Sequence, residues 1–212
     1  VQGGRASENE SAFGRAWKYD KKRSGPSLVM GDIGTHAHNM LRFVTGLEVA
    51  ALSAKLGPIV PGRKVDDYAG AMLEMDNGSI GSFWVTQTAA GVENSLGFRI
   101  SGSKGTIEWN QEIPQRLNFL PIDAPAQILT PNGPLTLPLA ARASRIVKGH
   151  PEGFPAAFAN LYSDAAEAIA AAISGKKADP EAMHFPTSLD GLKGVEFVTA
   201  AVESSEKNGA WV

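Results

Sequence analysis

Asp32 and His36 are the residues of this 212-residue chain whose types and spacing most suggest chemistry. They lie four positions apart in the string Gly31-Asp32-Ile33-Gly34-Thr35-His36-Ala37-His38-Asn39, so on a helix they share one face. An imidazole can take a proton from a hydroxyl near neutral pH, while a neighbouring carboxylate orients it. The pair therefore indicates general acid/base chemistry. The chain has no cysteine, which excludes disulfides, thiolate zinc sites and cysteine nucleophiles.

Two other interpretations of the same string stay open. Asp32 can cap the start of a helix while His36 is a boundary histidine with a structural role only. Asp32, His36 and His38 can also be drawn as metal ligands. However, the two histidines diverge on a helix and no second cluster of carboxylates and histidines follows, so no metal is expected.

The element that must carry the pair is a helix over residues 33–45, because apolar residues recur there at helical spacing and Gly46 follows as a stop. On a helical wheel Asp32 and His36 lie beside the apolar stripe, at the edge of the buried face where a cleft would open. His38 falls on a third side of the wheel, away from both. The wheel therefore predicts that His38 has no part in the core or the site.

Strands are expected after this helix, because the period of the apolar residues changes from helical spacing to two. Two runs over 69–75 and 80–85 are joined by Asn77-Gly78, which is a strong hairpin signal. Shorter strands are expected over 97–101, 106–109, 117–120 and 127–129. Together they predict an antiparallel sheet of five or more strands.

Two long helices are expected near the end of the chain, over residues 154–173 and from 188 to about 207. The first carries an apolar stripe of Phe154, Phe158, Leu161, Ala165, Ile169 and Ile173. The core side predicted for the second is Leu189, Leu192, Val195, Val198 and Val202. Strands in one block with helices before and after predict an α+β fold, an open, mostly antiparallel β-sheet with helices packed on one face.

Composition excludes several classes of protein. The net charge is −2, with 20 Lys and Arg against 22 Asp and Glu, so there is no basic excess for nucleic acid. No apolar run reaches the length that spans a bilayer, so no membrane association is expected. The chain begins at Val1 without a start Met, as a cut through a longer protein would, and the expected location is the cytoplasm.

The Asp32/His36 string, taken with others along the chain, resembles the second domain of the Gfo/Idh/MocA oxidoreductases. The resemblance covers almost the whole chain and is strongest to the levoglucosan-dehydrogenase-like and inositol-dehydrogenase-like branch. The other strings that carry it are Trp17-Lys18-Tyr19-Asp20, Ser24-Gly25, Asp66-Asp67, Asn77-Gly78-Ser79-Ile80-Gly81, residues 87–96, Gly102-Ser103-Lys104-Gly105-Thr106-Ile107-Glu108-Trp109, Gly149-His150-Pro151-Glu152-Gly153-Phe154, Phe185-Pro186-Thr187 and Glu203-Ser204-Ser205.

This resemblance implies a two-domain enzyme, with a Rossmann domain that binds NAD or NADP and a second domain that holds a sugar or cyclitol. Residues 1–212 then form a single C-terminal domain for substrate binding and oligomerisation. The family's catalytic pair maps onto Asp32 and His36, with His36 as the base. No Gly-x-Gly-x-x-Gly string occurs, so no cofactor-binding residue is assigned and the isolated chain is expected to be inactive.

The expected function is that of an NAD(P)-dependent dehydrogenase fragment, oxidising a secondary hydroxyl of a sugar, anhydrosugar or inositol. The alternative is a non-catalytic carbohydrate-binding or assembly module that retains the fold. A homodimer or homotetramer is expected through the open sheet face, because large apolar side chains occur on both faces of the strand near residue 83. Weaker candidates for substrate binding are Gln2, Trp17, Lys18 and His150. Packing in the core competes as an explanation for Trp17, and packing within a loop for His150.

Overall fold

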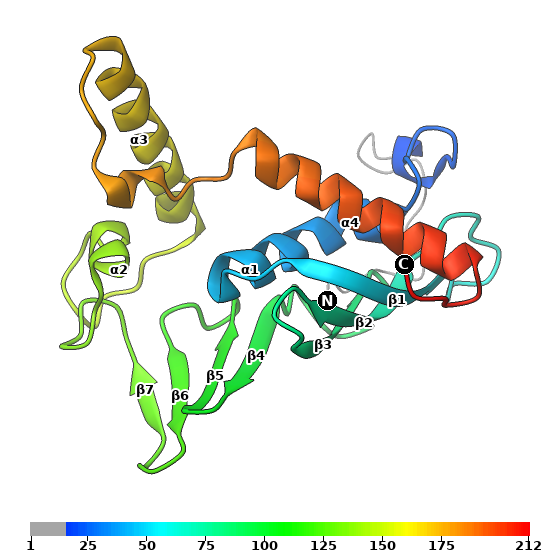
Figure 1. The fold of residues 1–212 in the computed structure, drawn as a ribbon, viewed down its shortest axis with the longest axis horizontal. Coiled ribbons are helices and arrows are strands. Elements are labelled where there is room, and N and C mark those ends of the chain that lie inside the picture. Colours follow the sequence, from blue (N-terminus) through cyan, green and yellow to red (C-terminus); the bar gives the residue numbers. More distant parts are fainter. Residues whose placement is uncertain (1–15) are drawn as a thin grey trace. The chain divides into compact units, whose positions relative to one another are not determined.

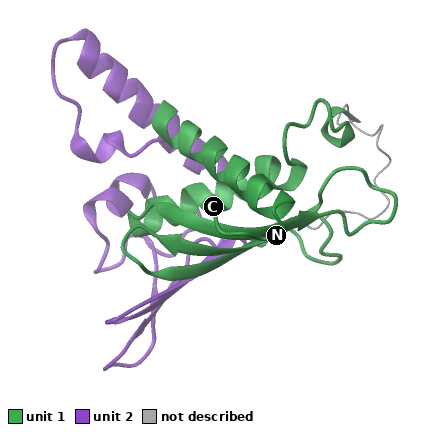
Figure 2. Ribbon diagram, turned by 45° about the vertical axis from the view of Figure 1, so that its right-hand side comes forward, with its two compact units in different colours: residues 1–96, 188–212 green, residues 97–187 purple. Residues whose placement is uncertain are grey.

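The computed structural model describes residues 16–212, so the candidate Gln2 lies outside the described part. The chain forms two compact units, coloured separately in Figure 2. Unit 1 combines residues 1–96 with 188–212, and unit 2 comprises residues 97–187. The candidate catalytic pair belongs to unit 1.

Unit 1 is a three-stranded antiparallel sheet with helices on one face (Figure 1). Its strands, in the order β1-β2-β3, are β1 (Val49–Gly57), β2 (Tyr68–Met75) and β3 (Ile80–Thr86). Its helical elements are the 3₁₀ turn η2 (Ala16–Tyr19), the π-helical turn η3 (Met30–Gly34), α1 (Thr35–Thr45) and α4 (Ser188–Glu206). The predicted stop at Gly46 is confirmed, since its φ of 68° is in the left-handed region that ends helices.

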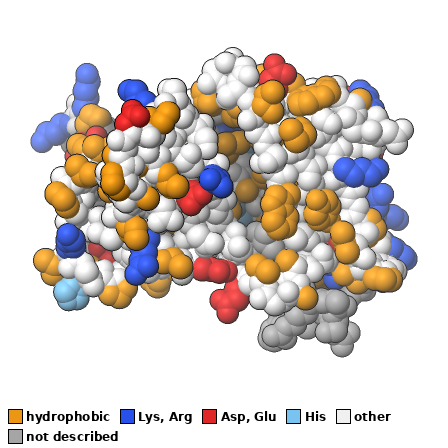
Figure 3. Space-filling view, turned by 90° about the horizontal axis from the view of Figure 1, so that it is seen from below, with side chains coloured by type: hydrophobic (Ala, Val, Ile, Leu, Met, Phe, Trp, Pro, Cys, Tyr) orange, Lys and Arg blue, Asp and Glu red, His pale blue; other side chains and the backbone are white. Residues whose placement is uncertain are grey.

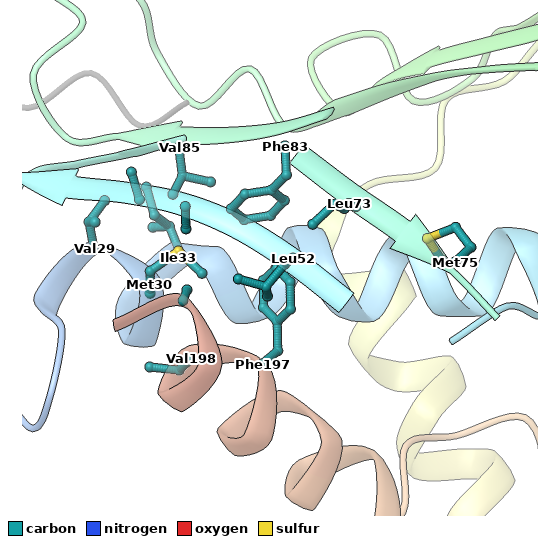
Figure 4. Packing of buried hydrophobic residues seen from close by; sticks show 13 residues of the cluster. Val29, Met30, Ile33, Leu52, Leu73, Met75, Phe83, Val85, Phe197 and Val198 are labelled. Atoms are coloured by element: carbon teal, nitrogen blue, oxygen red, sulfur yellow. The ribbon is translucent and has the colours of Figure 1, made fainter. Parts of the chain in front are cut away.

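The core of unit 1 lies between this sheet and the helices (Figure 4). Alternate residues of each strand point inward, so Leu52, Leu73 and Phe83 come from three different strands. Phe197 of α4 packs edge-on against Phe83, with ring centroids 5.3 Å apart. The sheet and both helices therefore share one apolar core.

The outer edge of β1 is closed by the end of the chain. The hydroxyl of Ser204, which is fully buried, accepts the N–H of Ala54 at 2.8 Å, and that of Ser205 accepts the N–H of Leu56 at 3.0 Å. Leu52 exchanges two backbone hydrogen bonds of 3.0 Å with Val212. The string Glu203-Ser204-Ser205 thus satisfies strand groups that an open edge would leave unpaired.

Unit 2 contains a four-stranded antiparallel sheet and three helical elements. The sheet has the order β4-β5-β6-β7, with β4 (Gly97–Gly102), β5 (Gly105–Asn110), β6 (Leu117–Pro121) and β7 (Gln127–Leu129). The helical elements are α2 (Pro138–Ala143), α3 (Phe154–Ile173) and the 3₁₀ turn η4 (Pro180–Met183). Arg142 of α2 forms ion pairs with Asp164 and Glu167 of α3 and lowers the pKa of Glu167 through a hydrogen bond.

The predicted antiparallel α+β class and six of the seven strands are confirmed. The strands form two sheets of three and four rather than one sheet of five or more, and β1 was not predicted. No helix in the described part of the chain is long and apolar enough to cross a membrane.

The predicted core side of α4 was wrong for most of its members. Leu189, Leu192 and Val195 are each more than half exposed. The buried residues of this helix are Gly194, Phe197, Val198, Ala201 and Ser204. The predicted and the observed core residues of α4 both recur at helical spacing, so spacing alone does not decide which side is buried. The buried side is the one with small residues, because it packs against α1 and β1. In α3 the span is confirmed, but no residue of its apolar stripe is buried.

Candidate functional site

The helical segment that carries the candidate pair begins with an N-terminal cap provided by another element. Asp66, just before β2, accepts the backbone N–H groups of Leu28 and Val29, both at 3.0 Å, and the hydroxyl of Ser27 at 2.5 Å. The Ser27 hydroxyl in turn accepts the N–H of Met30 at 3.1 Å. These bonds satisfy donors that a helix start leaves free, and they tie this segment to the sheet.

Asp32 lies within the π-helical turn and is held by two side chains from distant parts of unit 1. One carboxylate oxygen, Oδ1, forms a close ion pair with the ammonium group of Lys18 in η2. The other, Oδ2, accepts Nε2 of Gln87 at 2.9 Å. We call Lys18, Asp32 and Gln87 the Asp32 cluster. Lys18 and Asp32 are about one quarter exposed, so solvent and a ligand can reach them.

His36, in the first turn of α1, is exposed. Within residues 16–212 its imidazole makes no hydrogen bond, and none joins it to Asp32. The described residues therefore show no hydrogen bond through which Asp32 would orient His36. An exposed imidazole without a structural partner remains free to exchange a proton with a bound molecule.

His38 was predicted to lie away from the core, and this was wrong. It is 3% exposed and stacks on Phe197 of α4, with ring centroids 4.2 Å apart and planes 6° from parallel. Burial, with a smaller effect of the charge on Arg42, lowers the pKa of His38 to about 4. His38 is thus a neutral core residue. The wheel failed because α4 covers a second side of α1.

The 3₁₀ turn that carries Lys18 is held in place by a second acidic residue. Asp67 is fully buried and accepts the N–H groups of Ile59 at 2.6 Å and Val60 at 3.2 Å, together with Nη1 of Arg63 at 3.0 Å. The Arg63 guanidinium lies 5.2 Å from the centre of the Tyr19 ring, a cation–π distance. Asp67 therefore anchors the residue beside Lys18.

Gln87 follows the last residue of β3, and its backbone is fixed by the same acidic residue. The backbone carbonyl of Asp67 accepts the Gln87 N–H at 2.9 Å and the Thr86 hydroxyl at 2.9 Å. Sequence reasoning did not find Gln87 as a site residue. The only sequence feature that pointed to Gln87 was its membership of residues 87–96, one of the strings that resemble the family. An amide at the end of a strand has no spacing pattern that would mark it as a site residue.

The remaining candidates are placed as follows. Trp17 is 43% exposed, with the Lys18 ammonium 6.0 Å from its ring centre, so the competing explanation of core packing does not describe it. His150 belongs to unit 2, where it is exposed and its Nδ1 lies 3.2 Å from the carbonyl oxygen of Val147. No group of three or more potential ligands that could hold a metal occurs among the residues that the structure describes.

Comparison with known proteins finds the chain similar in sequence and fold to oxidoreductases. Residues 3–108 match the family described as GFO/IDH/MocA C-terminal domain. An oxidoreductase from Sinorhizobium meliloti has a similar structure, with a TM-score of 0.82 and 46% identity over 87% of this chain. An inositol dehydrogenase homologue from Azotobacter vinelandii, complexed with NADH and myo-inositol, gives a TM-score of 0.87 and 29% identity over the whole chain. Levoglucosan dehydrogenase, complexed with NADH and levoglucosan, gives a TM-score of 0.80 and 26% identity, also over the whole chain.

The chain spans about half of each of these proteins. It covers 51% of the Sinorhizobium chain, 54% of the inositol dehydrogenase homologue and 56% of levoglucosan dehydrogenase. The similarity therefore applies only to the half of each of these proteins that aligns with this chain.

Proposed function

This chain belongs to the GFO/IDH/MocA family of oxidoreductases as a C-terminal domain, and we propose that it forms the substrate-binding half of a nicotinamide-dependent polyol dehydrogenase. The proposed reaction oxidises a secondary hydroxyl of a sugar, anhydrosugar or inositol to a ketone. The observation that carries the proposal is the Asp32 cluster with the exposed His36 one turn away. Two similar structures hold a polyol and NADH, which supports the substrate class.

The residues of this chain do not fit a dinucleotide site. Every strand pair in residues 16–212 is antiparallel, and no Gly-x-Gly-x-x-Gly string occurs in the sequence. A dinucleotide fold needs parallel βαβ units that place phosphates at a helix N-terminus. The proposal therefore assigns NAD or NADP to another domain, and no residue here is given a role in accepting hydride.

His36 has the role of proton acceptor in this proposal. As the carbinol carbon loses its hydride, the hydroxyl proton passes to a ring nitrogen of neutral His36, and the carbon–oxygen bond becomes a carbonyl. Asp32 accepts a neighbouring hydroxyl of the polyol, since each carboxylate oxygen has a second lone pair. The Lys18 ammonium balances the charge of Asp32 and keeps N–H groups available for a substrate oxygen. Gln2, Trp17 and His150 remain predicted substrate contacts.

A polyol titration of the 212-residue chain tests this assignment. We expect myo-inositol or levoglucosan to shift the NMR signals of the His36 ring and leave those of His38 and His184 unchanged. His38 is enclosed by the core, and His184 lies beside Glu181 in unit 2, 3.6 Å away. Absence of any shift at His36, or equal shifts at His184, would contradict the proposed site.

A second titration tests the placement of the cofactor. Because the chain lacks the elements of a dinucleotide site, NADH added to it should give no saturable change in fluorescence at micromolar concentration. Saturable micromolar binding would show that the cofactor site was misplaced. Polyol binding by the complete protein without oxidation would favour the alternative of a carbohydrate-binding module.

A further inference from the structure

We propose that Gln87 determines substrate specificity, its side-chain carbonyl accepting a hydroxyl of the polyol while its amide holds Asp32. This inference rests on the proposed function and gives one member of the Asp32 cluster a role in choosing the substrate. Gln87 lies 55 positions from Asp32 in the sequence and reaches it from the end of β3.

The orientation of the Gln87 amide is fixed by its partner. An ionised carboxylate only accepts hydrogen bonds, so the group 2.9 Å from Asp32 Oδ2 must be the NH₂ end. The carbonyl end, Oε1, is then directed away from that oxygen. Within residues 16–212 no group donates a hydrogen bond to Oε1, although the side chain is half-buried.

The backbone of Gln87 is held firmly enough for such a role. Its N–H and the hydroxyl of Thr86 both donate to the carbonyl of Asp67, each at 2.9 Å. Thr86 is buried, and its hydroxyl also lies 2.7 Å from that of Thr88. A side chain with its backbone and its amide both fixed loses little further entropy on binding, which favours selective recognition.

The Asp32 cluster offers three kinds of polar group within a small region. Lys18 supplies N–H donors, Asp32 a charged acceptor, and Gln87 a neutral acceptor. Lys18 and Gln87 both bind the carboxylate of Asp32, so the polar ends of the two side chains lie close together. Each hydroxyl of a polyol both donates and accepts hydrogen bonds. These three side chains can therefore bind adjacent hydroxyls of one polyol at the same time.

A comparison of substrates and variants in the complete enzyme tests the inference. The substrate is the better of myo-inositol and levoglucosan, with its monodeoxy analogues. In Gln87→Met, we expect KM for the polyol to rise about tenfold, the loss of one hydrogen bond to substrate. KM for the nicotinamide cofactor should change less than KM for the polyol, since the proposed function assigns the cofactor to another domain. Gln127→Met is the control, because Gln127 is an exposed amide in β7 and should leave all constants unchanged.

The deoxy analogues separate recognition from a merely structural role. With the analogue that lacks the hydroxyl bound by Gln87, kcat/KM of the wild type should be about tenfold lower than with the parent polyol. In Gln87→Met, kcat/KM should be the same for that analogue and for the parent polyol. If Gln87 only holds Asp32, the variant keeps the wild-type discrimination at every hydroxyl, and the inference is overturned. Gln87→Asn, which withdraws the carbonyl by one methylene, should show the same loss of discrimination and replaces Gln87→Met if that variant does not fold.

Failure of the proposed function gives a different result. In that case the wild-type enzyme oxidises none of the polyols, whatever residue occupies position 87, and both statements fall. If the wild type oxidises a polyol and Gln87→Met retains its discrimination, the inference alone is overturned.

Discussion

At the scale of single residues, the main finding is that the carboxylate of Asp32 is engaged by Lys18 and Gln87 and not by His36. The sequence could predict Asp32 and His36 because their spacing and the surrounding string are distinctive. It suggested Lys18 more weakly. It could not predict Gln87, because its contact depends on where a strand ends 55 residues away. Their catalytic and binding roles remain proposals.

His38 shows how one residue can be misread from helical geometry alone. The wheel allows for one covered side of α1, whereas the sheet covers one side and α4 another. A histidine among charged neighbours then becomes a buried ring against Phe197. Its neighbours Arg42, Glu48 and Lys193 influence its pKa less than burial does.

The buried ring predicts how stability depends on pH. The pKa of His38 is about 4 in the folded chain, against 6.5 as the ordinary value for the unfolded chain. Between these values the unfolded chain binds a proton that the folded chain does not, so lowering the pH favours unfolding. His38 should therefore remove up to about 3 kcal/mol of unfolding free energy as the pH falls from about 7.5 to 4, with little change above that range.

Urea unfolding of the wild type and of His38→Phe at several pH values checks this prediction. Carboxylates titrate in both proteins, so their effect cancels in the difference between the two unfolding free energies. That difference reports His38 alone and should change over that pH window. His184→Phe is the control, since His184 is exposed. A wild-type and His38→Phe difference that stays constant from pH 7 to 4 would show that His38 is not buried as a neutral ring.

At the scale of elements, adjacent carboxylates before β2 organise the candidate site. Asp66 caps the helical segment that carries Asp32, and Asp67 fixes Arg63, beside Tyr19, and the backbone of Gln87. The sequence marked Asp66-Asp67 only as a string shared with a family. Its role could not be predicted because each bond spans tens of residues or links a loop to a turn.

The cap predicts a measurable loss of stability. Asp66→Ala leaves the N–H groups of Leu28 and Val29 without their acceptor and should lower the unfolding free energy by about 2 kcal/mol. Asp76→Ala is the matched control, because Asp76 is exposed in the turn after β2. Equal stability of the two variants in urea unfolding would mean that Asp66 does not cap this segment.

Secondary structure could be predicted better than the direction in which helices face. The hairpin of β2 and β3 and the four strands of unit 2 follow from alternation and turn residues, which are local signals. β1 was missed because its run, Val-Ala-Ala-Leu-Ser-Ala-Lys-Leu-Gly, is rich in alanine and weak in β-branched residues. The buried side of α4 depends on its partners, and the more apolar of two possible sides proved to be the exposed one.

At the scale of the whole molecule, the outer face of the three-stranded sheet carries large apolar side chains. Met72, Ile80 and Trp84 are 47%, 74% and 55% exposed, and hydrophobic side chains are visible over the surface drawn in Figure 3. The strand pairing places them on the side opposite Leu73, Phe83 and Val85. The predicted two-sided character of β3 is confirmed, and a second copy of the chain is the proposed partner.

Sedimentation equilibrium at micromolar concentration tests this assembly. We expect a dimer or tetramer, and Trp84→Lys should shift the population toward the monomer, because a charge would be buried at the contact. Ile59→Lys, at an exposed loop residue, is the control and should still assemble. A wild type that sediments as a monomer, with Trp84 accessible to a water-soluble quencher, would contradict the proposal.

The central claim, that His36 accepts the proton in polyol oxidation, is tested most directly by the turnover of His36→Ala in the complete enzyme that carries this chain. The imidazole is exposed and has no hydrogen bond within the described residues, so its removal should leave the unfolding free energy nearly unchanged. Loss of a general base should lower kcat by about 10²-fold or more, while His184→Ala keeps wild-type turnover. Wild-type turnover in His36→Ala, or a loss explained by a smaller folded fraction, would contradict the account.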